Sequence, residues 1–121
     1  MGEQPWANTG GSMYLTMNRF KVKPGHEAEF EAIWTGRDSH LPQVPGFKAF
    51  NLFKGPMVQE GGQDAYRLYA SHTIWESEAA FTAWTKSEAF RAAHRGAGES
   101  RDIYLGPPEL EIFESVQQIG I

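Results

Sequence analysis

The chain has 121 residues, 40% of them hydrophobic and 13% aromatic, and its formal net charge is −4 at pH 7. This length fits one domain, and the apolar content indicates a folded core rather than a disordered chain. Because the net charge is negative and the sequence shows no stripe of basic residues, we expect no nucleic-acid partner. The absence of cysteine excludes disulfides, thiolate metal sites and iron–sulfur clusters. No apolar run approaches the ~20 residues that cross a bilayer, so we expect no membrane partner and a cytoplasmic location.

The first strand and the first helix are visible in the spacing of apolar residues. Residues 1–12 are polar and rich in glycine, so we expect a flexible extension there and a folded domain at 13–121. Residues 13–22 alternate as a strand whose two faces both begin apolar, which is typical of a sheet covered on each side. Residues 26–40 then follow the spacing of an amphipathic helix, and Pro42 marks its exit.

Three more strands and a helical segment complete the pattern. A second strand is expected at 46–54, ended by Gly55-Pro56, with a surface loop over 55–64 and a third strand over 65–74. Two Ser-Glu pairs, at Ser77 and Ser87, then precede apolar helical patterns. Serine is a good helix N-cap, so these pairs predict two short consecutive helices or one kinked helix. A last strand is expected at about 109–118.

This order of elements, β-α-β-β-α-β, is that of ferredoxin-like α+β domains with an antiparallel sheet. Such a domain packs its helices on one face of the sheet and leaves the other face available. The apolar second face of the first strand then needs a cover. A second copy of the sheet is the simplest one, so we expect a symmetric homodimer of the dimeric α+β barrel type.

His94 is the first residue with possible chemistry. It lies four residues after Phe90, on the apolar face of the last predicted helix. Imidazole is a common ligand of haem iron, and a helix mounts it rigidly. Spacing alone leaves a second interpretation open, and it is the commoner one: a histidine at the boundary of the core that hydrogen-bonds locally.

Asn18 and two tryptophans are also unusual. Asn18 shares a strand face with apolar residues, where its amide either bonds to neighbouring backbone or points into a pocket toward a ligand. Trp75 ends the third strand, and Trp84 lies three residues after Phe81 on the following helix. Aromatic residues at this spacing are usually core, but a flat macrocycle also needs large apolar walls.

Two segments resemble the Isd-type haem-degrading monooxygenases of the antibiotic-biosynthesis-monooxygenase (ABM) superfamily. They are MNRFKVKPG at 17–25 and SHTIWESEAAFTAWTKSEAFRAAHRGAG at 71–98, and the resemblance extends over about residues 13 to 118. It implies an ABM-type ferredoxin-like domain. It further implies that His94 is the axial ligand of haem iron, that Asn18 is a distal amide near the iron-bound oxygen, and that Trp75 presses on the macrocycle and ruffles it.

The reaction that this resemblance implies uses haem as both cofactor and substrate. Oxygen and an external electron donor open the macrocycle to an open-chain tetrapyrrole and release iron. Phe90 and Trp84 are expected to line the haem, and Arg37 is a candidate for pairing with its propionates, although a solvated Arg37 is an equally simple interpretation. The alternatives are a cofactor-free ABM-type monooxygenase acting on a quinol-like aromatic, a haem-binding protein without catalysis, and a dimeric domain without chemistry.

Overall fold

The computed structural model describes residues 13–37, 40–62, 64–93 and 102–120. The expected extension over 1–12 lies outside these residues. One antiparallel sheet holds all four strands, in the order β2-β3-β1-β4. The elements are β1 (Tyr14–Val22), α1 (Glu27–Thr35), the 3-10 helix η1 (Leu41–Gln43), β2 (Phe47–Val58), β3 (Tyr66–Trp75), α2 (Glu78–Thr85), α3 (Glu88–Ala93) and β4 (Glu109–Glu114).

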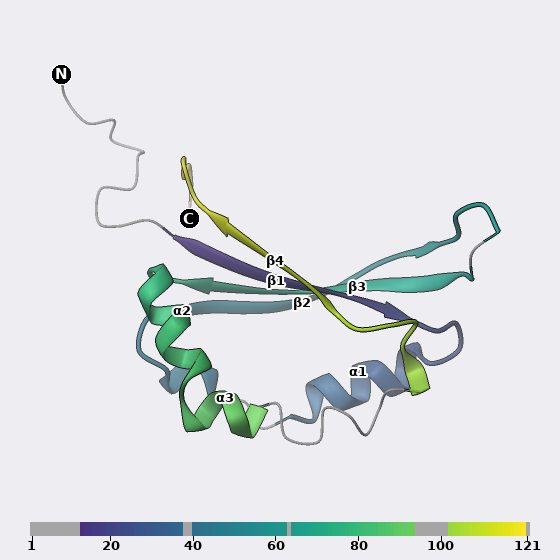
Figure 1. Ribbon diagram of the computed structural model, residues 1–121, viewed down its shortest axis with the longest axis horizontal. Coiled ribbons are helices and arrows are strands. Elements are labelled where there is room, and N and C mark those ends of the chain that lie inside the picture. The colour runs from purple at the N-terminus through teal and green to yellow at the C-terminus, as the bar shows by residue number, and fades with distance from the viewer. Residues whose placement is uncertain (1–12, 38–39, 63, 94–101, 121) are drawn as a thin grey trace.

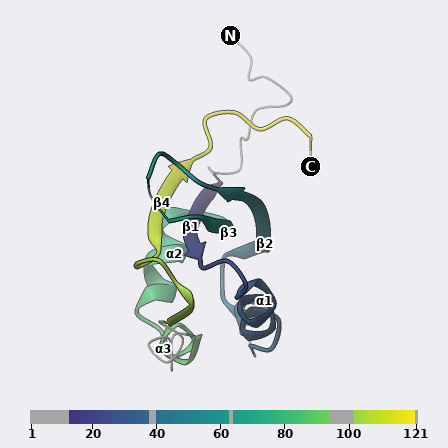
Figure 2. The ribbon, with the colours of Figure 1, turned by 90° about the vertical axis from the view of Figure 1, so that its right-hand side faces the viewer.

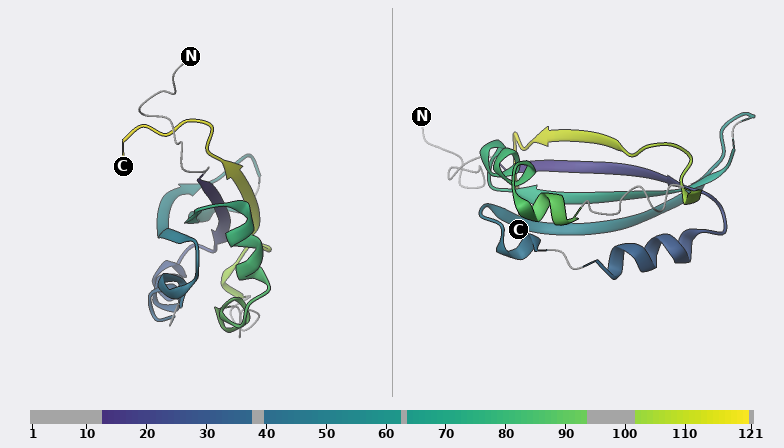
Figure 3. Two further views of the ribbon diagram at one scale, coloured as in Figure 1. Left: turned by 90° about the vertical axis from the view of Figure 1, so that its left-hand side faces the viewer. Right: turned by 60° about the horizontal axis from the view of Figure 1, so that its bottom comes forward.

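The helices lie on one side of the sheet, as Figure 1 shows. Figure 2 shows α1 and α3 apart from each other on that side. The same arrangement is seen from below in the right-hand view of Figure 3, with α1 at one end of the sheet and α2 at the other. Strand β1 lies between β3 and β4, which is the order of a ferredoxin-like domain. The predicted α+β ferredoxin-like class is confirmed.

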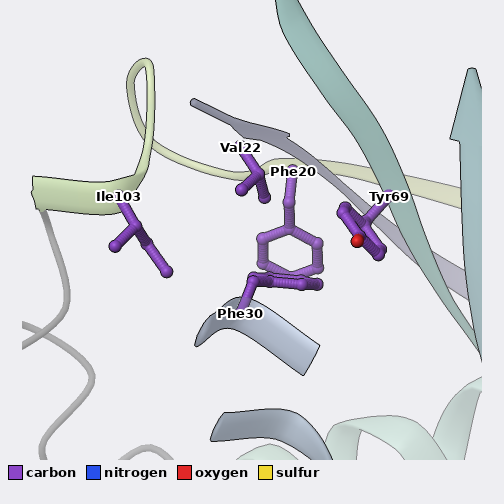
Figure 4. Packing of buried hydrophobic residues seen from close by; sticks show 5 residues of the cluster. All are labelled: Phe20, Val22, Phe30, Tyr69 and Ile103. Atoms are coloured by element: carbon purple, nitrogen blue, oxygen red, sulfur yellow. The ribbon is translucent and has the colours of Figure 1, made fainter. Parts of the chain in front are cut away.

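The main core lies between α1 and one end of the sheet (Figure 4). Phe30 of α1 is completely buried and packs against Phe20 of β1 and Tyr69 of β3, with ring centroids 5.5 and 4.3 Å away. Val22 and Ile103 complete this cluster. Burying a large apolar side chain contributes about 1.5–3 kcal/mol, so this cluster fixes α1 to the sheet.

The first helix is shorter than the sequence predicts. It ends at Thr35 rather than near residue 40, and Gly36 occupies its C-cap. Glycine favours helix termination because it has the lowest helix propensity after proline. The backbone N–H of Arg37 then reaches the carbonyl of Trp34, at 3.4 Å, which is the tighter i to i−3 pattern of a frayed helix end. As a result Arg37 lies beyond α1 instead of within the helix that the sequence predicts over 26–40.

The second strand is longer than the sequence predicts. It continues through Gly55 and Pro56 to Val58, so the expected surface loop begins later than residue 55. The pairing with β3 shifts between Lys54 and Met57. A bulge on an edge strand accepts a proline, because its missing N–H is not needed by a neighbouring strand.

The remaining elements follow the prediction more closely. Two consecutive helices begin after Ser77 and Ser87, as predicted, and each hydroxyl accepts a backbone N–H: that of Ala80 at 3.2 Å and that of Phe90 at 3.1 Å. Strand β4 ends at Glu114, four residues earlier than expected. Within the described ranges, no helix combines the length and apolar character needed to span a bilayer.

Candidate ligand-binding face

The helix-covered face of the sheet has polar residues in its middle, between two aromatic clusters. One cluster is the core under α1. The other, under α2, consists of Tyr14, Phe47, Trp75, Phe81 and Trp84. Between the clusters, strands β1 and β3 pair Thr16 with Thr73 and Asn18 with Ser71. We call these four residues the polar band. A sheet face under helices is ordinarily apolar, so the polar band is where this domain departs from simple core packing.

Asn18 is the only residue of the polar band with a carboxamide. Its side chain is half-buried on the helix side of the central strand. No hydrogen bond joins this carboxamide to another residue in the described part of the chain. A half-buried amide without protein partners is costly unless water or a ligand satisfies it. Among the two interpretations of Asn18, this geometry favours the one in which the amide faces a ligand.

Trp75 belongs to the aromatic cluster under α2, and its side chain is completely buried. Its exposed fraction is 0%, and its indole N–H donates to the Thr16 hydroxyl at 3.1 Å. Phe81 and Trp84 cover it, with ring centroids 5.9 and 5.2 Å away. Trp75 therefore has no exposed surface in this conformation, and the direct contact with the macrocycle that the resemblance implies stays a prediction.

Trp84, from the aromatic cluster under α2, contacts Phe90 of α3, and these two rings are less buried than Trp75. Both side chains are half-buried, and their rings meet edge to face at 4.9 Å. Trp84 comes from α2 and Phe90 from α3, and the Ser87 cap positions the turn between them. These two predicted lining residues are brought together, next to Trp75 and at the edge of the polar band.

A second aromatic wall, formed by Trp34 and Phe50 on the α1 side of the polar band, was not predicted from the sequence. Trp34 of α1 stacks almost parallel on Phe50 of β2, with ring centroids 6.0 Å apart and 11° between the planes. The guanidinium of Arg37 lies over the same Trp34 ring at 4.3 Å. The spacing of Trp34 and Arg37 along the helix could have indicated this contact. The sequence could not indicate that Phe50 faces the helices, because the register shift in β2 between Phe47 and Ala49 changes which residues lie on that face.

Strand β4 contributes apolar surface to the same face. Register with β1 places Leu110 opposite Asn18 and Ile112 opposite Thr16, and both side chains are about half exposed. His94 follows α3 directly but lies outside the described residues, so its role stays a prediction. Among the described residues, no group of three histidine, aspartate or glutamate side chains is arranged to hold a metal ion.

Comparison with known proteins identifies relatives over most of the chain. Residues 13–96 match the model of the family described as antibiotic biosynthesis monooxygenase. A 42-residue stretch, 35% of the chain, is 52% identical to the heme-degrading monooxygenase of Shouchella clausii and spans only 38% of that relative's length. Over 106 residues the chain is 32% identical to a heme oxygenase (mycobilin-producing) of Mycobacterium tuberculosis, which covers 88% of this chain and 91% of the relative.

A solved structure is similar in both sequence and fold. The heme-degrader MhuD of Mycobacterium tuberculosis, solved with two hemes bound in its active site, superposes with a TM-score of 0.61 at 30% identity. The superposition covers 88% of this chain and 99% of MhuD. The family match extends over more than half of the sequence and agrees with the observed ferredoxin-like topology. The chain belongs to the antibiotic biosynthesis monooxygenase family.

Proposed function

We propose that this protein is a haem-degrading monooxygenase, which opens the haem macrocycle with O₂ and an external electron donor to give an open-chain tetrapyrrole and free iron. The observation that carries the proposal is the carboxamide of Asn18, which hydrogen-bonds to none of the other described residues and lies in a polar band between aromatic walls. The relatives named as heme-degrading enzymes support the same activity.

The described residues fit haem as a substrate. A flat, largely apolar ring needs apolar contacts, which Trp84 and Phe90 supply at one end and the Trp34–Phe50 stack at the other. The iron needs one neutral nitrogen ligand, and His94 directly follows the helix that holds Phe90. Bound haem supplies the redox-active iron and the carbon skeleton that is oxidised.

Each protein group then has a physical task. His94 would hold the haem iron. The Asn18 amide N–H would donate a hydrogen bond to the oxygen substrate and so fix its direction, as a preorganised donor does in other active sites. The aromatic walls exclude water, which strengthens that hydrogen bond.

The two tryptophans have different tasks in this proposal. Trp84 is half-buried and contacts the macrocycle directly. Trp75 is rigidly held by Thr16 and packs behind Trp84, so it sets the position of the Trp84 ring rather than touching haem. Any distortion of the macrocycle that the resemblance assigns to Trp75 is transmitted through Trp84.

We also infer that the protein forms a homodimer through the uncovered face of the sheet. Leu15, Met17 and Ile74 lie on that face, and Phe53 and Phe113 extend it with exposed fractions of 48% and 47%. Exposed apolar surface of this kind marks an interaction site. A second copy covers it with an equal surface, as expected of a twofold interface.

A haem titration tests the enzyme directly. Haemin added to the purified protein should shift the Soret band, and an electron donor in air, with catalase present, should bleach it and release iron. No Soret shift would overturn the haem proposal and favour a cofactor-free oxidation of another aromatic. A shift without bleaching would leave a haem-binding protein. His94→Ala should abolish ligation, with His40→Ala as a control at an exposed histidine.

A further inference from the structure

The chain continues past β4 as a short segment, residues 115–120, that stands away from the rest of the subunit. Pairing with β1 stops at its first residue, where the Ser115 backbone N–H donates to the carbonyl of Met13 at 2.9 Å. Figure 1 shows the segment rising on the side of the sheet that faces away from the helices, and Figure 2 shows it crossing from the β4 side toward the β2 side. It therefore extends over the face that we infer to be the dimer interface.

This segment carries the two most exposed large hydrophobic side chains of the described residues. Val116 has an exposed fraction of 98% and Ile119 one of 72%. Single exposed apolar side chains are common on protein surfaces. Here, however, two of them lie in a segment without a charged side chain, directly after Phe113, which is itself exposed on the uncovered face of the sheet. The apolar surface of that face thus continues into the segment.

The segment lacks a neighbour in its own subunit. The sequence predicted a strand through residue 118, but β4 ends at Glu114, opposite the first residue of β1, Tyr14. Among the described residues, no strand pairs with 116–118. The Ser115 hydroxyl donates to the carbonyl of Gln117 at 3.1 Å, which holds the segment in a turn as it leaves the sheet. A surface that covers its apolar side chains must therefore come from elsewhere.

The uncovered face of the sheet differs between its two ends. The end from which the segment leaves is apolar and is formed by Leu15, Ile74 and Phe113. The other end carries two ion pairs between β1 and β4, Arg19–Glu111 at 2.8 Å and Lys21–Glu109 at 3.6 Å. Covering these charges with an uncharged segment would remove water from them without a new partner, which is costly. The segment therefore fits the apolar end of such a face.

We propose that residues 115–120 form an arm that packs on the second copy of the chain in the homodimer. Val116 and Ile119 lie against the apolar end of the sheet face of that copy. A twofold axis makes the contact reciprocal, so each subunit gives one arm and receives one. The arm rests on the inferred homodimer and is independent of the haem function.

Serine at both apolar positions tests what the arm contributes. In Val116→Ser/Ile119→Ser protein, we expect the dissociation constant of the dimer to rise at least about tenfold, because the burial of two apolar side chains per arm is lost. Mass photometry over a dilution series measures this constant, and circular dichroism reports the fold. Gln117→Ser changes an exposed polar residue of the same segment and is the matched control, which should leave the dissociation constant unchanged.

A single thiol shows which subunit the arm contacts. The chain has no cysteine, so Ile119→Cys protein carries one thiol, which benzophenone maleimide labels. Irradiation should link the arm to the other copy and give covalent dimers on a denaturing gel. Ala28→Cys places the same label on the exposed surface of α1, away from the uncovered face of the sheet, and should give only monomers.

The outcomes separate the arm from the dimer. Wild-type protein that is monomeric throughout the dilution series contradicts the homodimer itself. A dimer whose dissociation constant is the same in Val116→Ser/Ile119→Ser as in wild type, or a label at position 119 that gives no covalent dimer, overturns the arm while the dimer stands. A weaker dimer together with cross-linking between copies supports the arm.

Discussion

At the scale of single residues, exposure decides which candidate side chains meet a ligand. Asn18 and Trp75 lie on the same face of neighbouring strands. Asn18 is half-buried and its side chain hydrogen-bonds to no residue within the described ranges, whereas Trp75 is fully buried. The resemblance in sequence treats both as direct contacts, because a motif records residue type and position but not accessibility. The packing of Phe81 and Trp84 over Trp75 is what makes the two side chains differ in exposure.

Replacing Asn18 should impair turnover more than binding. We expect Asn18→Ala to bind haemin within about threefold of wild type and to degrade it about 100-fold more slowly, since removing one preorganised donor has an effect of this order. Gln43→Ala is the control, because Gln43 is an exposed carboxamide of η1 that lies outside the polar band. Comparable binding and bleaching rates for the Asn18 variant would refute the role given to its amide.

The two tryptophans should respond differently to the same substitution. Trp75→Phe should lower the free energy of unfolding by about 1–3 kcal/mol, because it removes buried volume and leaves the Thr16 hydroxyl without its donor. Trp84→Phe should cost less stability and alter the Soret spectrum of bound haem more. Urea denaturation and haemin titration of both variants measure this. A larger spectral change in the Trp75 variant would restore Trp75 as the direct contact.

At the scale of elements, regular spacing of apolar residues predicted where helices and strands lie, but it did not predict where α1 and β2 end. The presence of the four strands and of both serine caps follows from periodicity and hydrogen-bonding chemistry, and the order of elements along the chain indicated the fold class. The end of α1 at Gly36 and the passage of β2 through Pro56 did not follow, because each depends on which neighbour is present. The polar band contains a predicted residue, Asn18, but the Trp34–Phe50 wall depends on a bulge that no short-range pattern encodes.

The contact between α1 and β3 should make stability depend on pH at both extremes. Tyr69 donates a hydrogen bond to Glu31, which also pairs with Lys54 at 2.9 Å. The hydrogen bond from Tyr69, with the help of Lys54, lowers the pKa of Glu31, so its contribution is present above the usual value of 4.5 and is lost as the pH falls through the lowered pKa. Burial, reinforced by Glu31, raises the pKa of Tyr69 above 10.0, so its contribution is present below pH 10 and is lost as the pH rises further.

Tyr69→Phe should therefore flatten the stability profile at both ends. Urea denaturation between pH 3 and pH 11 measures the profile, and Tyr66→Phe is the matched control because Tyr66 lies on the same strand and outside this contact. The same loss of stability below pH 4.5 and above pH 10 in Tyr69→Phe as in wild type would show that the contact does not link α1 to the sheet.

At the scale of the whole molecule, our proposals give the two faces of one sheet different tasks, ligand binding on one and dimerisation on the other. The helix-covered face holds the polar band, and the opposite face carries Phe53 and Phe113 to the surface. We expect Phe113→Asp to convert the dimer to a monomer, because a charge cannot be buried there without a partner. Light scattering after gel filtration measures this. Ile112→Asp, on the next residue but the opposite face, should leave the dimer intact. A monomeric wild type would contradict the proposed assembly.

The two edge strands of the sheet, β2 and β4, have features that oppose the addition of a strand from another copy of the chain. Edge strand β2 contains Pro56 and shifts its register against β3 there, and edge strand β4 carries carboxylates at Glu109, Glu111 and Glu114. Proline, bulges and charges all discourage the addition of another strand. Growth from strand to strand, which has no natural end, is thus disfavoured, whereas stacking face on face stops after two copies. The same sequence features that made β2 hard to predict thereby protect the protein from open-ended aggregation.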